Sequence, residues 1–308
     1  MTTTHRDPTT HREPTTSRAP AQGVPDARRV PAARPQRGRR RARDWWVHVL
    51  LAVGGVFIGF PFVWVVLTAL RTEQDINAGG LLPHQFTVEN FVSVWRQLPL
   101  LRYYANSLLV AGGILIGQLV TSIPAGYALA RMKFRGSRGV FWIVLLCILV
   151  PTQVSAIPVY LMLSSAGLLN TLGGLILPFL GSAFGVYLFR QFFLQLPESV
   201  IEAARLDGAG TARIIWHMVL PMSRPAVISF SVFSVSAHWN DFFWPFFTLR
   251  GDSVATVPFG IAMFASNESG TQYGLQMAAA LFAIAPLIVF FLFFQRRFIT
   301  GIALQTER

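Results

Sequence analysis

Six long apolar stretches dominate this chain and constrain its fold more than any other feature. A helix of about 20 residues crosses the roughly 30 Å hydrocarbon core of a bilayer and satisfies its own backbone polar groups. With 53% hydrophobic and 13% charged residues, the 308-residue chain is too apolar for an ordinary soluble domain. The sequence therefore predicts an all-α, polytopic membrane protein with six transmembrane helices, at about 45–70, 103–130, 140–163, 172–193, 225–247 and 273–294.

The distribution of basic residues predicts the orientation of these spans. If the N-terminus lies inside, the inner segments hold 22 Lys and Arg residues and the outer segments hold 4. Short cytoplasmic loops carry the excess of Lys and Arg in membrane proteins. Both termini and the long polar loop at 197–221 are therefore expected in the cytoplasm.

Residues 1–44 are rich in Thr, Pro and Arg and contain almost no large apolar residues, so we expect a disordered, basic cytoplasmic tail. The arginines at 37–43 before Trp45 superficially resemble a twin-arginine export signal. The apolar run that follows is longer than a signal segment and has no convincing cleavage site, which favours a retained first span. Residues 45–302 then form the membrane domain, and 303–308 form a short C-terminal tail.

The net charge of +12 alone would admit a nucleic-acid partner. However, 11 of the 26 basic residues lie in the first 44 positions and most others lie at loop edges. Membrane topology explains them, so we expect contact with lipid and none with nucleic acid. The polar segment 71–102 is long enough for a short interfacial helix outside the membrane.

The polar loop 197–221 lies between two strongly apolar segments and predicts a docking element. Pro197 suits the first turn of a helix and Gly208 suits a left-handed stop, so 198–207 is expected to be helical. A second short helix is expected to end near 220–221. Ala203 and Ala204 offer a flat surface to a partner's groove, and Glu202 stands three residues before Arg205, a spacing that favours pairing. An amphipathic connection between spans is the simpler alternative.

The residues of this loop also carry a resemblance. Glu202, Ala203 and Ala204, then Gly208, then Met218-x-Leu220-Pro221 resemble the EAA loop of ABC importer permeases, which inserts into a cleft of the ATP-hydrolysing subunit. Met218 stands where isoleucine is usual. The resemblance implies that Glu202, Ala203, Ala204, Asp207, Gly208, Leu220 and Pro221 couple the chain to a partner ATPase.

Further stretches are similar to the carbohydrate, maltose-type branch of these permeases over about 45–302. They are YANSL at 104–108, AGYALAR at 125–131, VPTQ at 150–153, GVYLFRQFF at 185–193 and WNDF at 239–242. The resemblance implies four kinds of partner: a second homologous permease, two ATP-binding cassette subunits, an extracytoplasmic solute-binding protein and membrane lipid. It also implies the cytoplasmic membrane of a prokaryote, with a sugar as cargo. Glycerol phosphate, a polyol or another small solute is the alternative cargo.

No catalytic constellation is evident in the sequence, and we expect no enzyme activity and no cofactor of its own. Lys133 is the only lysine and lies outside any phosphate-binding loop, so ATP must be bound by partner subunits. His217 and His238 stand apart in the sequence, and Cys147 is expected to be a small buried side chain. Asp241 lies near the outer end of its span, where an interfacial or inter-subunit pairing is expected.

A sugar path requires hydrogen-bonding groups and flat apolar faces, and polar residues within spans usually face the bundle interior. Interhelical hydrogen bonds are the competing explanation for each of them. The candidates are Asn106, Gln118, Thr121, Thr152, Gln153, Ser155, Ser234 and Asn240, with Trp239 as an aromatic face.

Overall fold

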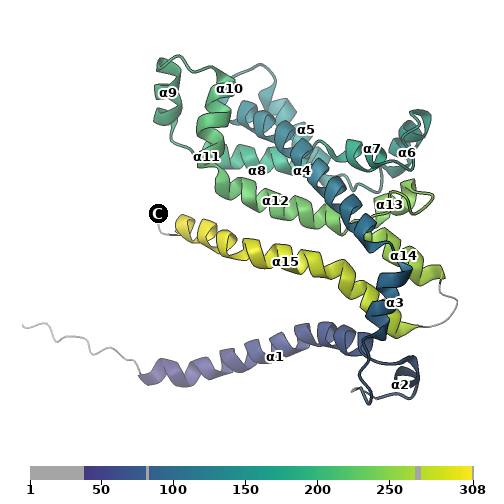
Figure 1. Cartoon of the computed structure of the whole chain (residues 1–308). Helices are drawn as coiled ribbons and strands as arrows, with labels where there is room; N and C mark the ends of the chain where they lie inside the picture. Colours follow the sequence, from purple (N-terminus) through teal and green to yellow (C-terminus); the bar gives the residue numbers. More distant parts are fainter. Residues whose placement is uncertain (1–37, 81–82, 268–271, 307–308) are drawn as a thin grey trace, which may run out of the picture. The chain divides into compact units, whose positions relative to one another are not determined.

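A computed structural model describes residues 38–80, 83–267 and 272–306, and this part of the chain is helical without a named strand (Figure 1). The helices are α1 (Gly38–Ala69), α2 (Glu73–Asn77), α3 (Glu89–Gln97), α4 (Leu100–Arg131), α5 (Ser137–Leu149), α6 (Ala156–Ser165), α7 (Leu172–Ile176), η1 (Leu177–Phe179), α8 (Ala183–Leu194), α9 (Glu198–Leu206), α10 (Thr211–Ile214), η2 (Ile215–Val219, a π-helix), α11 (Leu220–Met222), α12 (Arg224–Trp239), α13 (Phe243–Thr248), α14 (Val257–Asn267) and α15 (Tyr273–Thr306).

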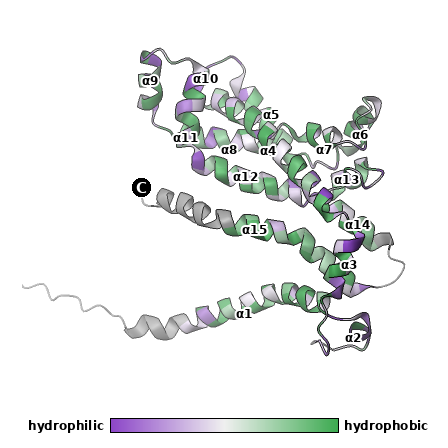
Figure 2. Ribbon diagram, in the orientation of Figure 1, coloured by the Kyte–Doolittle hydropathy of each residue, from purple (hydrophilic) through white to green (hydrophobic). Residues whose placement is uncertain are grey.

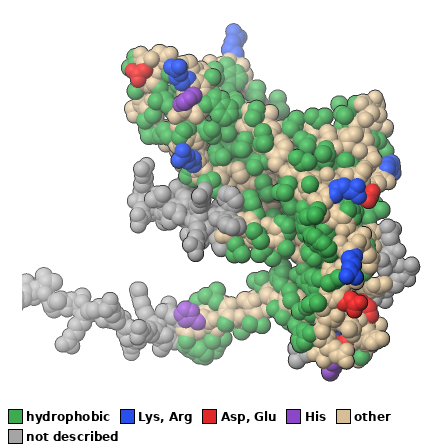
Figure 3. Space-filling view, in the orientation of Figure 1, with side chains coloured by type: hydrophobic (Ala, Val, Ile, Leu, Met, Phe, Trp, Pro, Cys, Tyr) green, Lys and Arg blue, Asp and Glu red, His purple; other side chains and the backbone are tan. Residues whose placement is uncertain are grey.

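The chain divides into two compact units, 1–56 and 57–308. The described part of the first unit is the beginning of α1, whose apolar side chains from Trp45 onward are largely exposed. The second unit holds all other helices. Hydrophobic residues predominate along its helices (Figure 2), and its visible face has broad hydrophobic areas and few charged side chains (Figure 3).

Three described helices are long and apolar enough to cross a membrane by themselves, within 45–69, 100–131 and 273–292. Two bent pairs raise the number of candidate spans to five. In the first pair, α7 and η1 together form one half, α8 forms the other, and the two halves are bent by 42°. In the second pair, the helical segment from α10 to α11 and the helix α12 are bent by 81°. The chain is therefore a polytopic membrane protein whose spans are less regular than the apolar runs suggest.

The span expected over 140–163 is interrupted at Pro151, one of the prolines expected to break the spans. α5 ends at Leu149 and α6 begins at Ala156, with a non-helical segment between them. Val150 has an extended backbone (ψ 116°) because it precedes Pro151, and the residue before a proline is disfavoured in the α conformation. The expected helix 225–247 is likewise interrupted, after Trp239.

Several expected boundaries also shift. α1 begins at Gly38, inside the expected tail, while residues 1–37 lie outside the described part of the chain. α15 continues to Thr306, past the expected end of the membrane domain at 302. The segment 71–102 contains two short helices, α2 and α3, instead of one, and α14 was not predicted.

The helix α4 is central to the second unit, where it packs against α8 and α12. One apolar cluster, which includes Tyr127, Phe189 and Phe230, joins these helices to the 197–221 loop. Gly126 makes the close contact with α8 possible, because a Cβ atom there would lie only 2.9 Å from Cβ of Phe189. Close packing of α4 against α8 therefore explains why the stretch AGYALAR has a glycine at position 126.

A buried ion pair organises the segment that follows α1, and the sequence patterns gave no sign of it. Arg71 Nε donates to Asp75 Oδ2 at 2.9 Å, and both side chains are almost fully buried. The same guanidinium donates to the carbonyl groups of Asp75 and Gly80, and the backbone N–H of His84 donates to the Asp75 carboxylate. These bonds connect Arg71 and Asp75 to each other and to the backbone of Gly80 and His84.

We expect this ion pair to weaken in acid. The hydrogen bond from Arg71 holds the pKa of the Asp75 carboxyl below its ordinary value. The stability from the pair is therefore present above about pH 4 and is lost as the pH falls through the lowered pKa. Thermal unfolding of the purified chain should show a gap between the wild type and Asp75→Asn that narrows below about pH 4. A gap that stays constant into acid would contradict this role.

Candidate functional site

The first helix of the 197–221 loop forms as the sequence predicts. α9 runs over Glu198–Leu206 after Pro197, and Gly208 has a φ of +78°. Gly208 N–H donates to Arg205 O at 3.0 Å, and Ala209 N–H donates to Ala204 O at 2.9 Å. Many helices end in this way: a glycine in the left-handed conformation follows the last turn, and the N–H groups there donate to carbonyl groups of that turn.

The exposed face of α9 differs from the expected one. Ala204 is only 2% exposed and packs with Ile201 into the apolar cluster, so the expected flat surface of two alanines is wrong. Glu202, Ala203 and Leu206 are exposed, and the Leu206 side chain is 89% exposed. We call these three residues the α9 face.

Glu202 and Arg205 are not paired, because the ion pairs of the described residues involve other side chains. The carboxylate of Glu202 is thus available to a partner. Asp207 and Gly208 are exposed beside it.

The second helical piece of the loop runs from α10 through the π-helical turn η2 into α11. Ile214, Ile215 and Val219 bury it against the cluster, while Leu220 is half-buried and Pro221 is exposed. The Ser223 hydroxyl donates to Val219 O at 2.6 Å at the bend where α12 begins. The loop is therefore packed against the spans as one body and is not a loose connection (Figure 1).

Two arginines connect the ends of α4 and α8 just before the loop. Arg131, at the end of α4, donates through Nε and Nη2 to Phe193 O, at 3.0 and 2.7 Å, and through Nη2 to Leu196 O. Arg190 of α8 donates in return to Leu129 O of α4 at 3.3 Å. Cationic side chains near a helix C-terminus satisfy its free carbonyl groups and interact favourably with its dipole. Because α9 begins four residues after α8 ends, these bonds fix the segment that connects α8 to α9.

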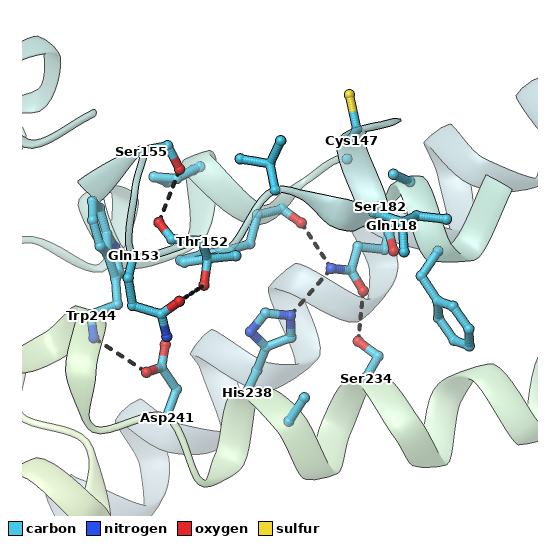
Figure 4. Close-up of a pocket in the computed structure, with 18 of the residues that line it drawn as sticks. Gln118, Cys147, Thr152, Gln153, Ser155, Ser182, Ser234, His238, Asp241 and Trp244 are labelled. Atoms are coloured by element: carbon cyan, nitrogen blue, oxygen red, sulfur yellow. Dashed lines mark hydrogen bonds between the residues drawn. The ribbon is translucent and has the colours of Figure 1, made fainter. Parts of the chain in front are cut away.

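A cavity of about 580 Å³ lies among α4, α5, α8, α12, α13 and the break at 150–155 (Figure 4). Five sequence-predicted candidates line it: Gln118, Thr152, Gln153, Ser155 and Ser234. Thr152, Gln153 and Ser155 are exposed within the break. The interruption of the expected third helix thus brings its polar residues to the cavity.

Gln118 forms the polar centre of the buried wall. Its Nε2 donates to Phe179 O at 3.0 Å and lies 3.2 Å from His238 Nε2, and its Oε1 accepts from the Ser234 hydroxyl at 2.7 Å. These bonds join α4 to η1 and α12. The interhelical explanation therefore accounts for the amide of Gln118, which also faces the cavity. His238, which stands alone in the sequence, is part of this network.

The other four candidates lie away from the cavity lining. Asn106 donates to Ala255 O at 3.0 Å, and the Thr121 hydroxyl donates to Leu180 O at 2.8 Å. Trp239 is 5% exposed, stacks on Tyr104 and donates its indole N–H to Ala283 O, so it offers no free aromatic face. Asn240 donates to Ser236 O within its own turn.

Sequence reasoning missed several lining residues. Phe233 and Phe243 supply exposed aromatic faces, and Cys147 is exposed instead of buried as expected. Asp241, expected to pair at an interface, lines the cavity and accepts the backbone N–H of Trp244 at 3.2 Å. Asp241 and Phe243 lie at the break between α12 and α13, and the apolar pattern of the sequence did not predict that they line the cavity.

The cavity lining contains one carboxylate, Asp241, and no lysine or arginine. Across the described residues, no group of three or more His, Cys, Asp or Glu side chains is arranged to hold a metal ion. The arrangement offers amide, hydroxyl and aromatic groups, which bind by hydrogen bonding and stacking.

Residues 122–303, which contain the α9 face, Arg190 and most of the cavity, match the family described as binding-protein-dependent transport system inner membrane component. The chain belongs to this family. It is 32% identical over 272 residues to the sn-glycerol-3-phosphate transport system permease protein UgpE of Yersinia pestis, covering 85% of this chain and 97% of the relative. It is 30% identical over 262 residues to the arabinooligosaccharides transport system permease protein AraQ of Halalkalibacterium halodurans, covering 82% and 94%.

The fold of this permease also matches a solved one. A crystal structure of a bacterial ABC transporter involved in the import of alginate contains a chain with a TM-score of 0.73 to this one, at 22% identity, covering 85% and 98% of the two chains. The family match and the two relatives confirm the prediction of an ABC importer permease. The permease is an integral component of the prokaryotic inner membrane, it is not an enzyme, and its importer relies on partner ATPases for energy.

Proposed function

We propose that this permease forms half of the membrane path of an importer for a neutral sugar or oligosaccharide. The observation that carries the proposal is the polar and aromatic lining of the cavity, which includes Thr152, Gln153, Ser155, Phe233 and Phe243 and only one charged side chain, Asp241. Sugars are recognised by hydrogen-bonding groups placed around their hydroxyls and by flat apolar surfaces against their rings.

Glycerol phosphate, the solute in the name of one relative, fits this lining less well. Phosphate groups are bound by arginine, lysine or helix N-terminal N–H groups. The lining holds no cationic side chain, and its Asp241 carboxylate would repel a phosphate. The oligosaccharide in the name of the other relative therefore agrees better with the chemistry of this lining.

We further propose six crossings, made by α1, α4, α5 with α6, α7 with α8, α12 with α13, and α15. The excess of basic residues in the tail and at 131–138 supports cytoplasmic termini and a cytoplasmic 197–221 loop. In this orientation the α9 face meets the ATPase.

The mechanism follows from this placement. A solute-binding protein delivers the sugar from outside, and a second permease closes the path. Two ATPase subunits draw the α9 helices together when they bind ATP. Because α9 is packed on α8 and α12, its displacement moves the spans around the cavity as rigid bodies, and hydrolysis resets them.

Uptake by the reconstituted importer tests the cargo. The permease would be placed in proteoliposomes with its partner permease, ATPases and solute-binding protein, and ATP-dependent uptake of labelled neutral oligosaccharides would be compared with that of sn-glycerol-3-phosphate. We expect uptake of a neutral sugar and no competition from a large excess of sn-glycerol-3-phosphate. Uptake of sn-glycerol-3-phosphate alone would overturn the proposed cargo. If neither solute is taken up and the permease does not associate with the ATPases, the proposed coupling is overturned.

A further inference from the structure

A second cavity, of about 460 Å³, opens between α5 and the ends of α4 and α8, away from the sugar cavity. Its polar end is formed by Ser137, Arg138 and Arg190, and its walls by Phe141, Trp142 and Leu145. We propose that this cavity binds the phosphate group of an anionic lipid. The proposal does not depend on the identity of the imported solute.

The two arginines supply an uncompensated positive charge. The Arg190 guanidinium is half-buried, with Cζ 3.9 Å from the centre of the Phe141 ring, and Arg138 is exposed at the rim. Neither forms an ion pair with a carboxylate of the described residues. Arg190 donates through Nε to Leu129 O, so its two terminal nitrogen groups are not engaged in that bond. A partly buried charge at a membrane is costly without a counter-charge, and the planar guanidinium suits a phosphate.

The start of α5 lies at the same end of the cavity. α5 has 13 residues, and its N-cap, Gly136, provides no side-chain hydrogen bond to the first turn. Ser137 and Arg138 are the first two residues of this turn and line the cavity. Ser137 N–H already donates to Phe134 O at 3.3 Å, so the contribution of the helix start is the positive end of its dipole, which favours an anion at this position. The start of α5, which carries Arg138, and Arg190 of α8 thus line the same cavity.

The walls favour a lipid over a free phosphate ion. Trp142 is 61% exposed, and α5 buries none of its own residues in this chain. An acyl chain therefore finds apolar surface along α5 below the phosphate. Tryptophan is enriched at the level of the lipid headgroups, and basic pockets between spans on the cytoplasmic side bind anionic headgroups.

Native mass spectrometry of the assembled importer tests the site. The importer in detergent would be titrated with phosphatidylglycerol and, separately, with phosphatidylcholine. We expect saturable binding of phosphatidylglycerol that becomes roughly fivefold weaker in Arg138→Gln, because one basic residue near a membrane surface contributes about that factor. Arg138 makes no described hydrogen bond, so this variant should fold normally. Arg190→Gln should weaken binding further.

Arg135→Gln is the matched control, since this arginine lies three residues away in the same turn and does not line the cavity. We expect it to bind phosphatidylglycerol as the wild type does. Equal binding by the wild type and Arg138→Gln, or equal binding of the two lipids, would overturn the proposal. Displacement of the lipid by millimolar inorganic phosphate would show that the site takes free phosphate and would overturn its assignment to a lipid.

Discussion

Reversing Glu202 to lysine is expected to reduce ATP-driven uptake about tenfold or more, because like charges brought together at an interface cost several kcal/mol and 1.4 kcal/mol is a factor of ten. Glu202 is exposed on the α9 face and has no ion-pair partner within the described chain. Under the proposed coupling, this exposed negative charge meets the ATPase. Membrane insertion should be unchanged, since the residue contributes nothing to the apolar cluster.

Replacing Gly208 with valine should have the same effect by a different route. A β-branched residue at a φ of +78° is strained by about 1–3 kcal/mol, which would unwind the end of α9 and displace its exposed face. Gly210→Ala is the matched control, because Gly210 has a φ of −67° and open space around its Cα.

Both variants would be assayed for uptake per amount of permease in the membrane and for co-purification of the ATPase. We expect weakened recovery of the ATPase with undiminished recovery of the second permease. Normal uptake by Glu202→Lys and Gly208→Val would refute the role of the α9 face.

Replacing Arg131 with alanine is expected to uncouple ATP hydrolysis from transport. Arg131 donates to the carbonyl groups of Phe193 and Leu196, and hydrogen bonds to charged groups each contribute about 1.5–3 kcal/mol. Without them the connection between α8 and α9 should bend when the ATPase pulls on α9. The displacement would then be absorbed before it reaches α4 and the cavity.

The measurement is the amount of sugar moved per ATP hydrolysed in proteoliposomes. We expect this ratio to fall about tenfold or more in Arg131→Ala, because the loss of a single charged hydrogen bond already corresponds to about that factor and the variant loses the bonds to both Phe193 O and Leu196 O. Arg131→Lys should recover part of it, since an ammonium group keeps the charge but not the forked geometry. Arg135→Ala, in the exposed turn that follows, should behave as the wild type. A parallel fall of hydrolysis and transport, with an unchanged ratio, would show that Arg131 acts only in folding.

The sequence by itself predicted the helical membrane class, the α9 helix and its glycine stop. These features are local or compositional: long apolar runs indicate spans, and Pro197 and Gly208 bound α9 through their own backbone preferences. The match over 122–303 then confirmed the family that the loop motif had indicated.

Other features were decided by tertiary packing. The burial of Ala204 depends on which side of α9 meets the apolar cluster, and the spacing of two alanines does not contain this information. Gln118, Ser234 and His238 lie far apart in the sequence and meet only because α4 and α12 pack side by side. The Arg131 bonds likewise join helix ends more than 60 residues apart. Local patterns specify the helices, whereas the contacts that build the cavity and hold α9 depend on how those helices pack, because a side chain's partners come from other segments of the chain.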